Sequence, residues 1–170
     1  LFKSNELLLY DENDFGITPF NNICILNDIK FLKNIIQHNI SFDEYDKRGL
    51  SLIHYSIINN STNIFKFLVD KYEYVCKLET RKEKITPIML CIIHDRVDMT
   101  RYIFSKSNLN HKDIYGNTNY HYLIMYSRIK LLSFIDKHNE ENYVGITPNE
   151  YKIRNLIMTL YNNKDTKSIL

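Results

Sequence analysis

The sequence predicts an all-α solenoid of about four to five helix-turn-helix units joined by short turns. The first observation is that every glycine and proline of the 170-residue chain falls in one recurring frame. There are only four glycines and three prolines, and each proline follows a threonine. The second observation is that the threonine or serine of this frame recurs at spacings of 33, 35, 32 and 29 residues. A period near 33 residues is typical of repeat proteins, in which each unit buries its apolar face only against its neighbours.

The frames contain two or three of the signals that mark the start of a helix. The frames are Gly16-Ile17-Thr18-Pro19, Gly49-Leu50-Ser51-Leu52, Lys84-Ile85-Thr86-Pro87, Gly116-Asn117-Thr118-Asn119 and Gly145-Ile146-Thr147-Pro148. Glycine allows the positive φ of a tight turn, and threonine or serine is suited to cap the helix by accepting a hydrogen bond from a backbone N–H. Proline at the first helical position loses no hydrogen bond. Lys84 stands at the glycine position of the third frame.

Two helices are expected after each turn. A short apolar helix comes first, for example Phe20 to Leu26, and the first helices end at Asn27, Asn60, Asp95 and Ser127. The second helices are expected at Ile29 to Gln37, Ile64 to Lys71, Val97 to Lys106 and Ile129 to Lys137. Their apolar residues recur at helical spacing, as in Phe31, Leu32, Ile35 and Ile36.

The repeat frame also divides the chain into segments. Residues 1–13 are expected to be the tail of a preceding repeat or an N-terminal cap. The repeat domain is expected over 14–161, with units at about 14–45, 46–80, 81–112 and 113–141 and a partial cap at 142–161. Residues 162–170 are expected to form a flexible linker. The chain begins with Leu1 instead of Met, so we expect it to be a piece of a longer protein.

These residues resemble the ankyrin repeat, whose pattern is a Gly-x-Thr-Pro-Leu-His turn followed by two antiparallel helices. The best matching segments are Asp46 to His54 and Asp113 to His121, and the resemblance covers roughly Asp11 to Tyr161. It implies an ankyrin repeat solenoid with four helix pairs and a partial one. The family's paired alanines correspond here to Ile23-Cys24, Ser56-Ile57, Cys91-Ile92 and Leu123-Ile124. We therefore expect Ile124 to be buried between helices.

The sequence contains no constellation that predicts catalysis, a cofactor or a metal ion. His54 and His121 occupy the histidine position of the repeat, where the resemblance implies a local hydrogen bond around the turn. No two histidines have His-x-x-x-His spacing, and none pairs with a cysteine at zinc-finger spacing. Cys24 and Cys91 are expected in the core, and Cys76 in a loop where it is exposed. We therefore expect that this chain alone is not an enzyme.

Charge and hydropathy exclude two further classes of partner. The 22 basic and 20 acidic residues give a net charge of +2, which is not the strongly basic charge typical of nucleic-acid-binding proteins. Apolar stretches such as Ile88 to Ile93 are far shorter than the roughly 20 residues that span a bilayer. Three cysteines without metal spacing indicate reduced thiols. We expect a cytoplasmic monomer, at the cytoplasmic face of a membrane if the whole protein has transmembrane spans.

The resemblance implies that partners bind a concave face made by the turn tips and the first helix of each pair. Carrying the frame over gives these partner-binding candidates: Phe15, Ile25, Tyr45, Arg48, Ile58, Asn59, Leu90, His94, Tyr115, Met125, Tyr126 and Tyr143. Many are apolar or aromatic, as in the core of a protein interface. In the alternative interpretation, Ile25, Ile58 and Ile93 only pack between repeats.

Three functions are compatible with these observations. The first is a non-catalytic module that binds a peptide or protein segment on its concave face. The second rests on Lys47 to Asn60, with its run His54 to Asn60, which is similar to the ankyrin domain of ankyrin-type DHHC palmitoyltransferases. In that family the domain recruits the substrate, and an asparagine and an aromatic residue line the peptide groove. The asparagine corresponds to Asn59 of this chain. The aromatic residue corresponds to Leu90, which has no ring. The third is an ankyrin effector that captures a host protein.

Overall fold

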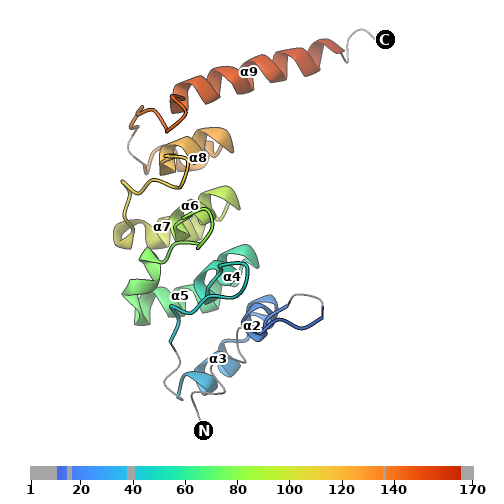
Figure 1. Ribbon diagram of the computed structural model, residues 1–170, viewed down its shortest axis with the longest axis vertical. Coiled ribbons are helices and arrows are strands. Elements are labelled where there is room, and N and C mark those ends of the chain that lie inside the picture. Colours follow the sequence, from blue (N-terminus) through green and yellow to red (C-terminus); the bar gives the residue numbers. More distant parts are fainter. Residues whose placement is uncertain (1–10, 15–16, 38–40, 136, 166–170) are drawn as a thin grey trace. The chain divides into compact units, whose positions relative to one another are not determined.

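The computed structural model describes residues 11–14, 17–37, 41–135 and 137–165, with side chains of the last helix up to Thr159 (Figure 1). The described residues form helices and turns and contain no β-strand. The expected N-terminal helix tail at Leu1 to Leu9 and the candidate Phe15 lie outside the described residues. By contact density the chain divides into two compact units, Leu1–Asn108 and Leu109–Leu170. The boundary falls just before the fourth turn of the repeat frame.

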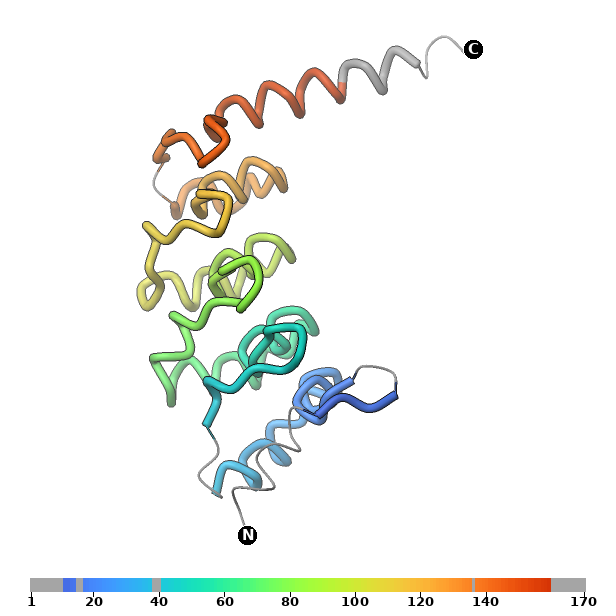
Figure 2. The backbone as a smooth tube through the Cα atoms, in the orientation of Figure 1, coloured from blue at the N-terminus to red at the C-terminus, as the bar shows by residue number. Residues whose placement is uncertain are grey.

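The first unit contains three helix pairs. They are α2 (Pro19–Leu26) with α3 (Ile29–Ile36), α4 (Leu52–Ile58) with α5 (Thr62–Lys71), and α6 (Pro87–Ile93) with α7 (Val97–Ile103). Short 3-10 helices follow α5 and α7, at Glu73–Lys77 (η1) and Phe104–Lys106 (η2). The inner helices α2, α4 and α6 pack side by side, and the outer helices α3, α5 and α7 form a second layer behind them (Figure 2).

The inner and outer helices of each pair are joined through a residue with positive φ. Asn27, Asn60, Asp95 and Ser127 have φ values of 49°, 56°, 56° and 53°. Asparagine and aspartate enter this left-handed region more easily than most residues, because their short polar side chains bond to the nearby backbone. The predicted ends of the first helices are therefore confirmed at all four positions.

The threonine and glycine of the frame act as the sequence predicts. Thr18 Oγ1 accepts a hydrogen bond from the N–H of Asn21 at 3.0 Å. Gly49 has a φ of 80°, and a Cβ placed on it would lie 2.8 Å from the Cβ of Arg81. Lys84 keeps the positive φ of the glycine that it replaces, at 54°. Its turn is one residue longer, since the N–H of Thr80 donates to Ile85 O, whereas the N–H of Asp46 donates to Leu50 O.

The core of the first unit is filled by large apolar side chains from every helix pair. Phe20, Phe42, Phe65, Leu32, Leu52, Ile53, Ile57, Ile64, Leu68, Ile88, Met89 and Ile92 are almost fully buried. Cys24 and Cys91 are buried among them, as expected. The expectation that Cys76 is exposed in a loop is wrong, because this residue lies in η1 and is also buried. A turn of 3-10 helix folds that segment back onto α5 and α6.

The second unit departs from the predicted repeat. It contains α8 (Asn119–Met125), a 3-10 turn at Ile129–Leu131 (η3) and the 18-residue helix α9 (Pro148–Asp165). The expected outer helix at Ile129 to Lys137 is wrong, because after η3 the described chain continues as turns. Helix α9 includes residues 162–165, which we expected to begin a linker.

Chain length explains the missing outer helix. The outer helices α3, α5 and α7 begin 17, 18 and 16 residues before the next turn, counted to Asp46, Thr80 and Asp113. Only 13 residues separate Ile129 from Asn142, where the fifth turn begins. A helix advances about 1.5 Å per residue, while extended chain covers about 3.3 Å. The shorter segment therefore reaches the next turn by giving up helix.

Candidate protein-binding surfaces

The turn tips are held by a side chain at the first position of each turn. Asp46 Oδ1 accepts hydrogen bonds from the N–H groups of Arg48 at 3.0 Å and Leu50 at 2.8 Å. Asp113 Oδ1 accepts from Tyr115 and Asn117, both at 2.8 Å. In the fifth turn Asn142 Oδ1 accepts in the same way, from Val144 at 3.1 Å and Ile146 at 3.0 Å. These bonds fix the candidate residues Arg48, Tyr115 and Tyr143 on ordered turns.

The two repeat histidines make the local hydrogen bonds that the resemblance implies. The N–H of Ser51 donates to His54 Nδ1 at 3.0 Å, so the proton lies on Nε2, which donates to Leu78 O at 3.3 Å. His121 bonds likewise to the N–H of Thr118 at 3.1 Å and to Ile146 O at 3.1 Å. Burial lowers the pKa of His54 to about 4, and it also lowers the pKa of His121. Both histidines are structural.

A tyrosine hydroxyl also bonds to the aspartate of two of these turns, and this bond was not predicted. The hydroxyl of Tyr55 donates to Asp46 Oδ2, and that of Tyr122 donates to Asp113 Oδ2 at 2.5 Å. The sequence does contain a signal for this pair, since Asp-x-x-Gly-x-Ser/Thr-x-x-His-Tyr occurs twice. Aspartate, histidine and tyrosine thus tie each of these turns to the start of the helix that follows it.

In the first unit, the candidates lie on the turn tips and on the far ends of the inner helices. Ile25 is 53% exposed and Leu26 beside it is more exposed still. Arg48 is exposed, and Tyr45, Ile58, Asn59 and His94 are half-buried. Leu90, the position of the aromatic residue in the transferase resemblance, is buried. The exposure of Ile25 weighs against the alternative that it only packs between repeats.

Two of these side chains already have partners within the unit. The amide nitrogen of Asn59 donates to Asn21 Oδ1 and to Tyr55 O, both at 3.0 Å. The guanidinium of Arg81 lies 4.6 Å from the centre of the Tyr45 ring. Both side chains are therefore held in place before any partner arrives.

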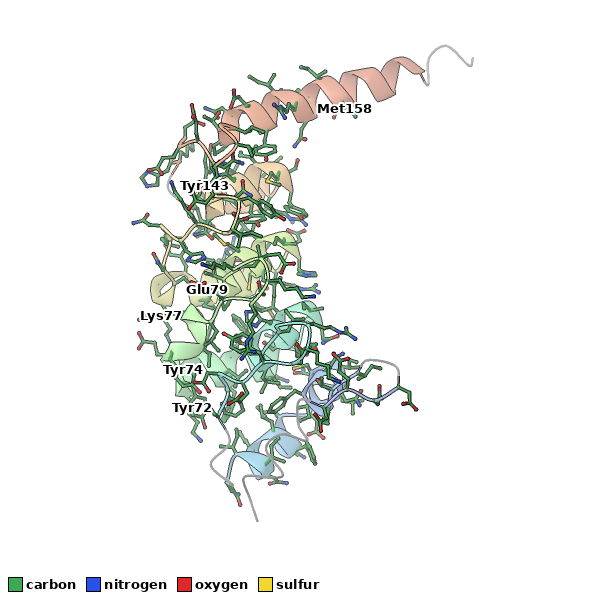
Figure 3. The ribbon with its side chains drawn as sticks, in the orientation of Figure 1. Tyr72, Tyr74, Lys77, Glu79, Tyr143 and Met158 are labelled. Carbon is green, nitrogen blue, oxygen red and sulfur yellow. The ribbon has the colours of Figure 1, made fainter. Side chains whose placement is uncertain are left out.

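In the second unit, the candidates form an aromatic patch on neighbouring turns. Tyr115 is 56% exposed, and Tyr143, which Figure 3 labels, is 70% exposed. The N–H of Tyr143 donates to Tyr115 O at 2.9 Å. A Cβ on Gly116 would lie 2.7 Å from the Tyr143 ring, so glycine is required for the two turns to approach. Tyr126 is exposed at the end of α8 and stacks on Tyr122, while Met125 is half-buried.

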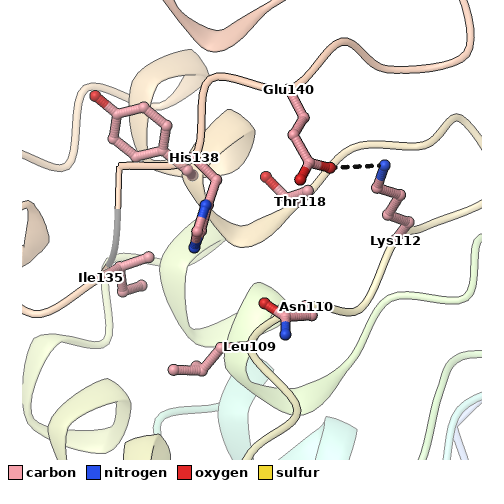
Figure 4. Close-up of a pocket in the computed structure, with 8 residues that line it drawn as sticks. Leu109, Asn110, Lys112, Thr118, Ile135, His138 and Glu140 are labelled. Atoms are coloured by element: carbon pink, nitrogen blue, oxygen red, sulfur yellow. Dashed lines mark ion pairs between the residues drawn. The ribbon is translucent and has the colours of Figure 1, made fainter.

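A pocket of about 360 Å³ with both polar and apolar lining residues opens beside these turns in the second unit (Figure 4). Leu109, Asn110, Thr118, Ile135 and His138 contribute to its wall. Lys112 Nζ lies 3.0 Å from Glu140 Oε2, and this bonded lysine lowers the pKa of Glu140. The ion pair links the segment before the fourth turn to the segment before the fifth.

Metal-binding clusters and activated cysteines are the two kinds of reactive group that can be checked among the described residues. They contain no group of three or more His, Cys, Asp or Glu side chains placed to hold a metal ion. Burial raises the pKa of Cys24, Cys91 and Cys76, which disfavours the nucleophilic thiolate. In the same part of the chain, no helix is long and apolar enough to cross a bilayer. The exposed apolar and aromatic side chains are therefore the main chemical feature of the surface.

Comparison with known proteins points to repeats of the ankyrin type. No family model matches the chain. It is 24% identical over 129 residues to the putative ankyrin repeat protein L371 of Acanthamoeba polyphaga mimivirus, which covers 74% of this chain. The helical repeats described above thus occur in a chain that is similar in sequence to an ankyrin repeat protein. The chain spans only 16% of the length of that viral protein.

A solved structure shares the fold. The chain superposes with a TM-score of 0.68 on one chain of the solved complex between the Bd0816 predatory endopeptidase from Bdellovibrio bacteriovorus and the immunity protein Bd3460. The match covers 89% of this chain and 81% of that one, at 16% sequence identity. At this identity the likeness concerns the fold alone, and it agrees with the helical repeat architecture described above.

Proposed function

We propose that this chain is a non-catalytic protein-interaction module that binds a segment of a partner protein with its turn tips and inner helix ends. The observation that carries the proposal is the exposure of large apolar and aromatic side chains at the frame positions, namely Ile25 and Leu26 in the first unit and Tyr115, Tyr126 and Tyr143 in the second. Such side chains are enriched in the interface positions that contribute most to binding.

The hydrogen bonds of the turns favour this use. Asp46, Asp113 and Asn142 hold the turn backbones with side-chain bonds, so the tips lose little conformational freedom when a partner binds. Ordering loops and side chains is one of the main costs of association, and an ordered surface avoids part of it. Charged residues at the tips, such as Lys47, Arg48, Lys82 and Glu83, would form the rim and orient the partner.

Both comparisons are compatible with protein binding. The mimivirus relative is named as an ankyrin repeat protein, and the structural neighbour comes from a complex between two proteins. The match to a viral protein also favours the effector alternative, capture of a host protein, as a second candidate function. The transferase alternative gains no support from either comparison.

The proposal is tested by selecting ligands from a phage-displayed library of random peptides on the whole chain. We expect enriched peptides whose binding falls roughly tenfold in the variant Tyr115→Ala/Tyr126→Ala, because aromatic side chains dominate interface energetics. The matched control is Phe31→Ala, which truncates an exposed ring on the outer helix α3. Equal binding to wild type and to the double variant, with thermal stability unchanged, would place the site elsewhere.

A further inference from the structure

An apolar groove lies in the second unit, separate from the turn tips. It has a volume of about 360 Å³ and is formed by α8, the segment after it and α9. Its apolar wall is formed by Leu123 and Ile124 of α8, Leu132 of the following segment and Leu156 of α9. Figure 3 shows α9 as a single helix, with Met158 labelled on it.

The shortened fourth repeat accounts for this groove. In the first unit the inner helices α2, α4 and α6 are each followed by an outer helix of seven to ten residues, namely α3, α5 and α7. After α8 the described chain forms only the 3-10 turn η3, and large apolar side chains remain in contact with water. Leu156 is 57% exposed, and Ile129 of η3 is more exposed still. Exposed apolar surface in a groove is typical of a binding site for another chain.

The described residues that line the groove carry charges of one sign. Its lining includes Arg128, Lys137 and Lys152, and no aspartate or glutamate is among the described residues that line it. Neither Lys137 nor Lys152 forms an ion pair with another described residue. Three cations around an apolar wall favour a ligand that combines carboxylates with apolar side chains, since complementary charge guides association and selects the partner.

We propose that this groove binds an acidic amphipathic helix of a partner protein. The helix would place apolar side chains against Leu156 and Ile129 and carboxylates beside Lys137 and Lys152. Helix-in-groove binding uses apolar anchors at positions i, i+3, i+4 and i+7, a spacing that fits a helix of two to three turns. This length matches the outer helices that cover the inner helices of the first unit. The site is additional to the turn-tip surface proposed above.

The test uses the whole chain and a fluorescein-labelled helical peptide with leucines at i, i+3, i+4 and i+7 and glutamates at the flanking positions. Fluorescence anisotropy measures its binding, with a peptide carrying lysine in place of glutamate as the ligand control. We expect the acidic peptide to bind at least roughly tenfold more tightly than the basic one, with affinity falling as salt screens the charges.

Two pairs of variants locate the site. Leu156→Asp should weaken binding roughly tenfold because it puts a carboxylate in the apolar wall, while Ile153→Asp, which changes an equally exposed residue of α9 outside the lining, should leave binding within about twofold. Lys152→Glu should weaken binding more than Arg154→Glu, which reverses a charge outside the lining on the same helix. Circular dichroism of each variant checks that α9 remains helical.

Three results would overturn the proposal. One is failure of the acidic peptide to bind more tightly than the basic peptide. Another is an equal loss of binding in Leu156→Asp and Ile153→Asp. The third is a dimer, seen by light scattering, that dissociates in Leu156→Asp and that the peptide cannot displace, because the groove would then be occupied by a second copy of this chain.

Discussion

Single residues control this fold mainly through bonds that close the turns. His54 is the clearest case, because it is fully buried, accepts from the N–H of Ser51 and donates to Leu78 O. That arrangement requires the neutral ring with its proton on Nε2. A protonated ring would place a second donor against the N–H of Ser51. The pKa of about 4 is the consequence of this burial.

The stability of the protein should therefore fall in acid through His54. Its pKa is lowered from 6.5, so the unfolded chain takes up a proton at higher pH than the folded chain does. The stabilising contribution is complete above pH 6.5 and is lost as the pH falls towards 4, by about 3 kcal/mol in the free energy of unfolding. Urea unfolding of wild type and His54→Gln at pH 7 and pH 4.5 measures it. The difference between the two proteins should shrink at pH 4.5.

The control for this measurement is Phe31→Ala, which truncates an exposed side chain that has no titratable group. Its difference from wild type should be the same at both pH values. A His54→Gln difference that stays constant with pH would contradict the role assigned to the buried ring.

At the scale of elements, the glycine position of the turns that start the helix pairs can hold another residue, provided that its backbone adopts a positive φ. Lys84 shows the limit of this tolerance, because it holds a φ of 54° in a position that glycine fills in the second, fourth and fifth turns. The left-handed conformation is unfavourable for a side chain with a Cβ, by about 1–2 kcal/mol. The third turn therefore contains strain that the surrounding hydrogen bonds maintain.

Lys84→Gly should relieve this strain. We expect an increase of about 1 kcal/mol or somewhat less in the free energy of unfolding, because the entropy that glycine loses on folding offsets part of the gain. Thermal and urea unfolding measure the change. Lys82→Gly, two residues earlier in the same loop and without a positive φ, should instead leave stability the same or lower it. A destabilised Lys84→Gly would mean that contacts of the lysine side chain outweigh its backbone strain.

The elements that the sequence predicted well are those specified locally. Threonine caps, the residues that end the inner helices and the bonds of His54 and His121 depend on neighbours within a few positions, so the repeat frame revealed them. The Asp46–Tyr55 and Asp113–Tyr122 bonds were as local and were missed, although their pattern occurs twice. The missing outer helix after α8 depends on how far the chain must travel to the next turn, and the burial of Cys76 depends on the packing of η1 against α5 and α6. Propensity alone does not contain that information.

The candidate site was predicted less completely than the fold. Exposure separates Ile25, Tyr115 and Tyr143 from Leu90, which sits at an equally plausible position of the repeat but is buried. The groove of the second unit was not foreseen at all, because it arises from a helix that the pattern predicted and the chain does not form.

At the scale of the whole molecule, the two units differ in how their helices are supported. Helix α4 is flanked by α2 and α6 and covered by α5, and Leu52, Ile53 and Ile57 are almost fully buried. In α9, every described side chain from Lys152 to Thr159 is exposed. In repeat proteins each element is stabilised by its nearest neighbours, so local opening should cost far less free energy in α9 than in α4.

Hydrogen exchange of the native chain should show this difference directly. We expect amides in the middle of α4 to exchange at least roughly a hundredfold more slowly than those of α9 after Asn155, because protection follows the free energy of local opening. Mass spectrometry of peptides covering 52–58 and 153–165 measures both rates. Similar protection of the two helices would mean that α9 is covered in solution, for example by a second copy.

The longer third turn also matters for anyone who wishes to modify this protein. It accommodates one more residue than the second turn, yet its ends are closed by backbone bonds between Thr80, Lys84 and Ile85, and Thr86 still accepts from the N–H of Met89 to cap α6. The extra residue of this loop therefore leaves the cap of α6 in place. An epitope or a fluorophore attachment site is therefore best inserted between the exposed residues Lys82 and Glu83, because Arg81 must stay in place, where its N–H donates to Gly49 O and its guanidinium lies over the Tyr45 ring.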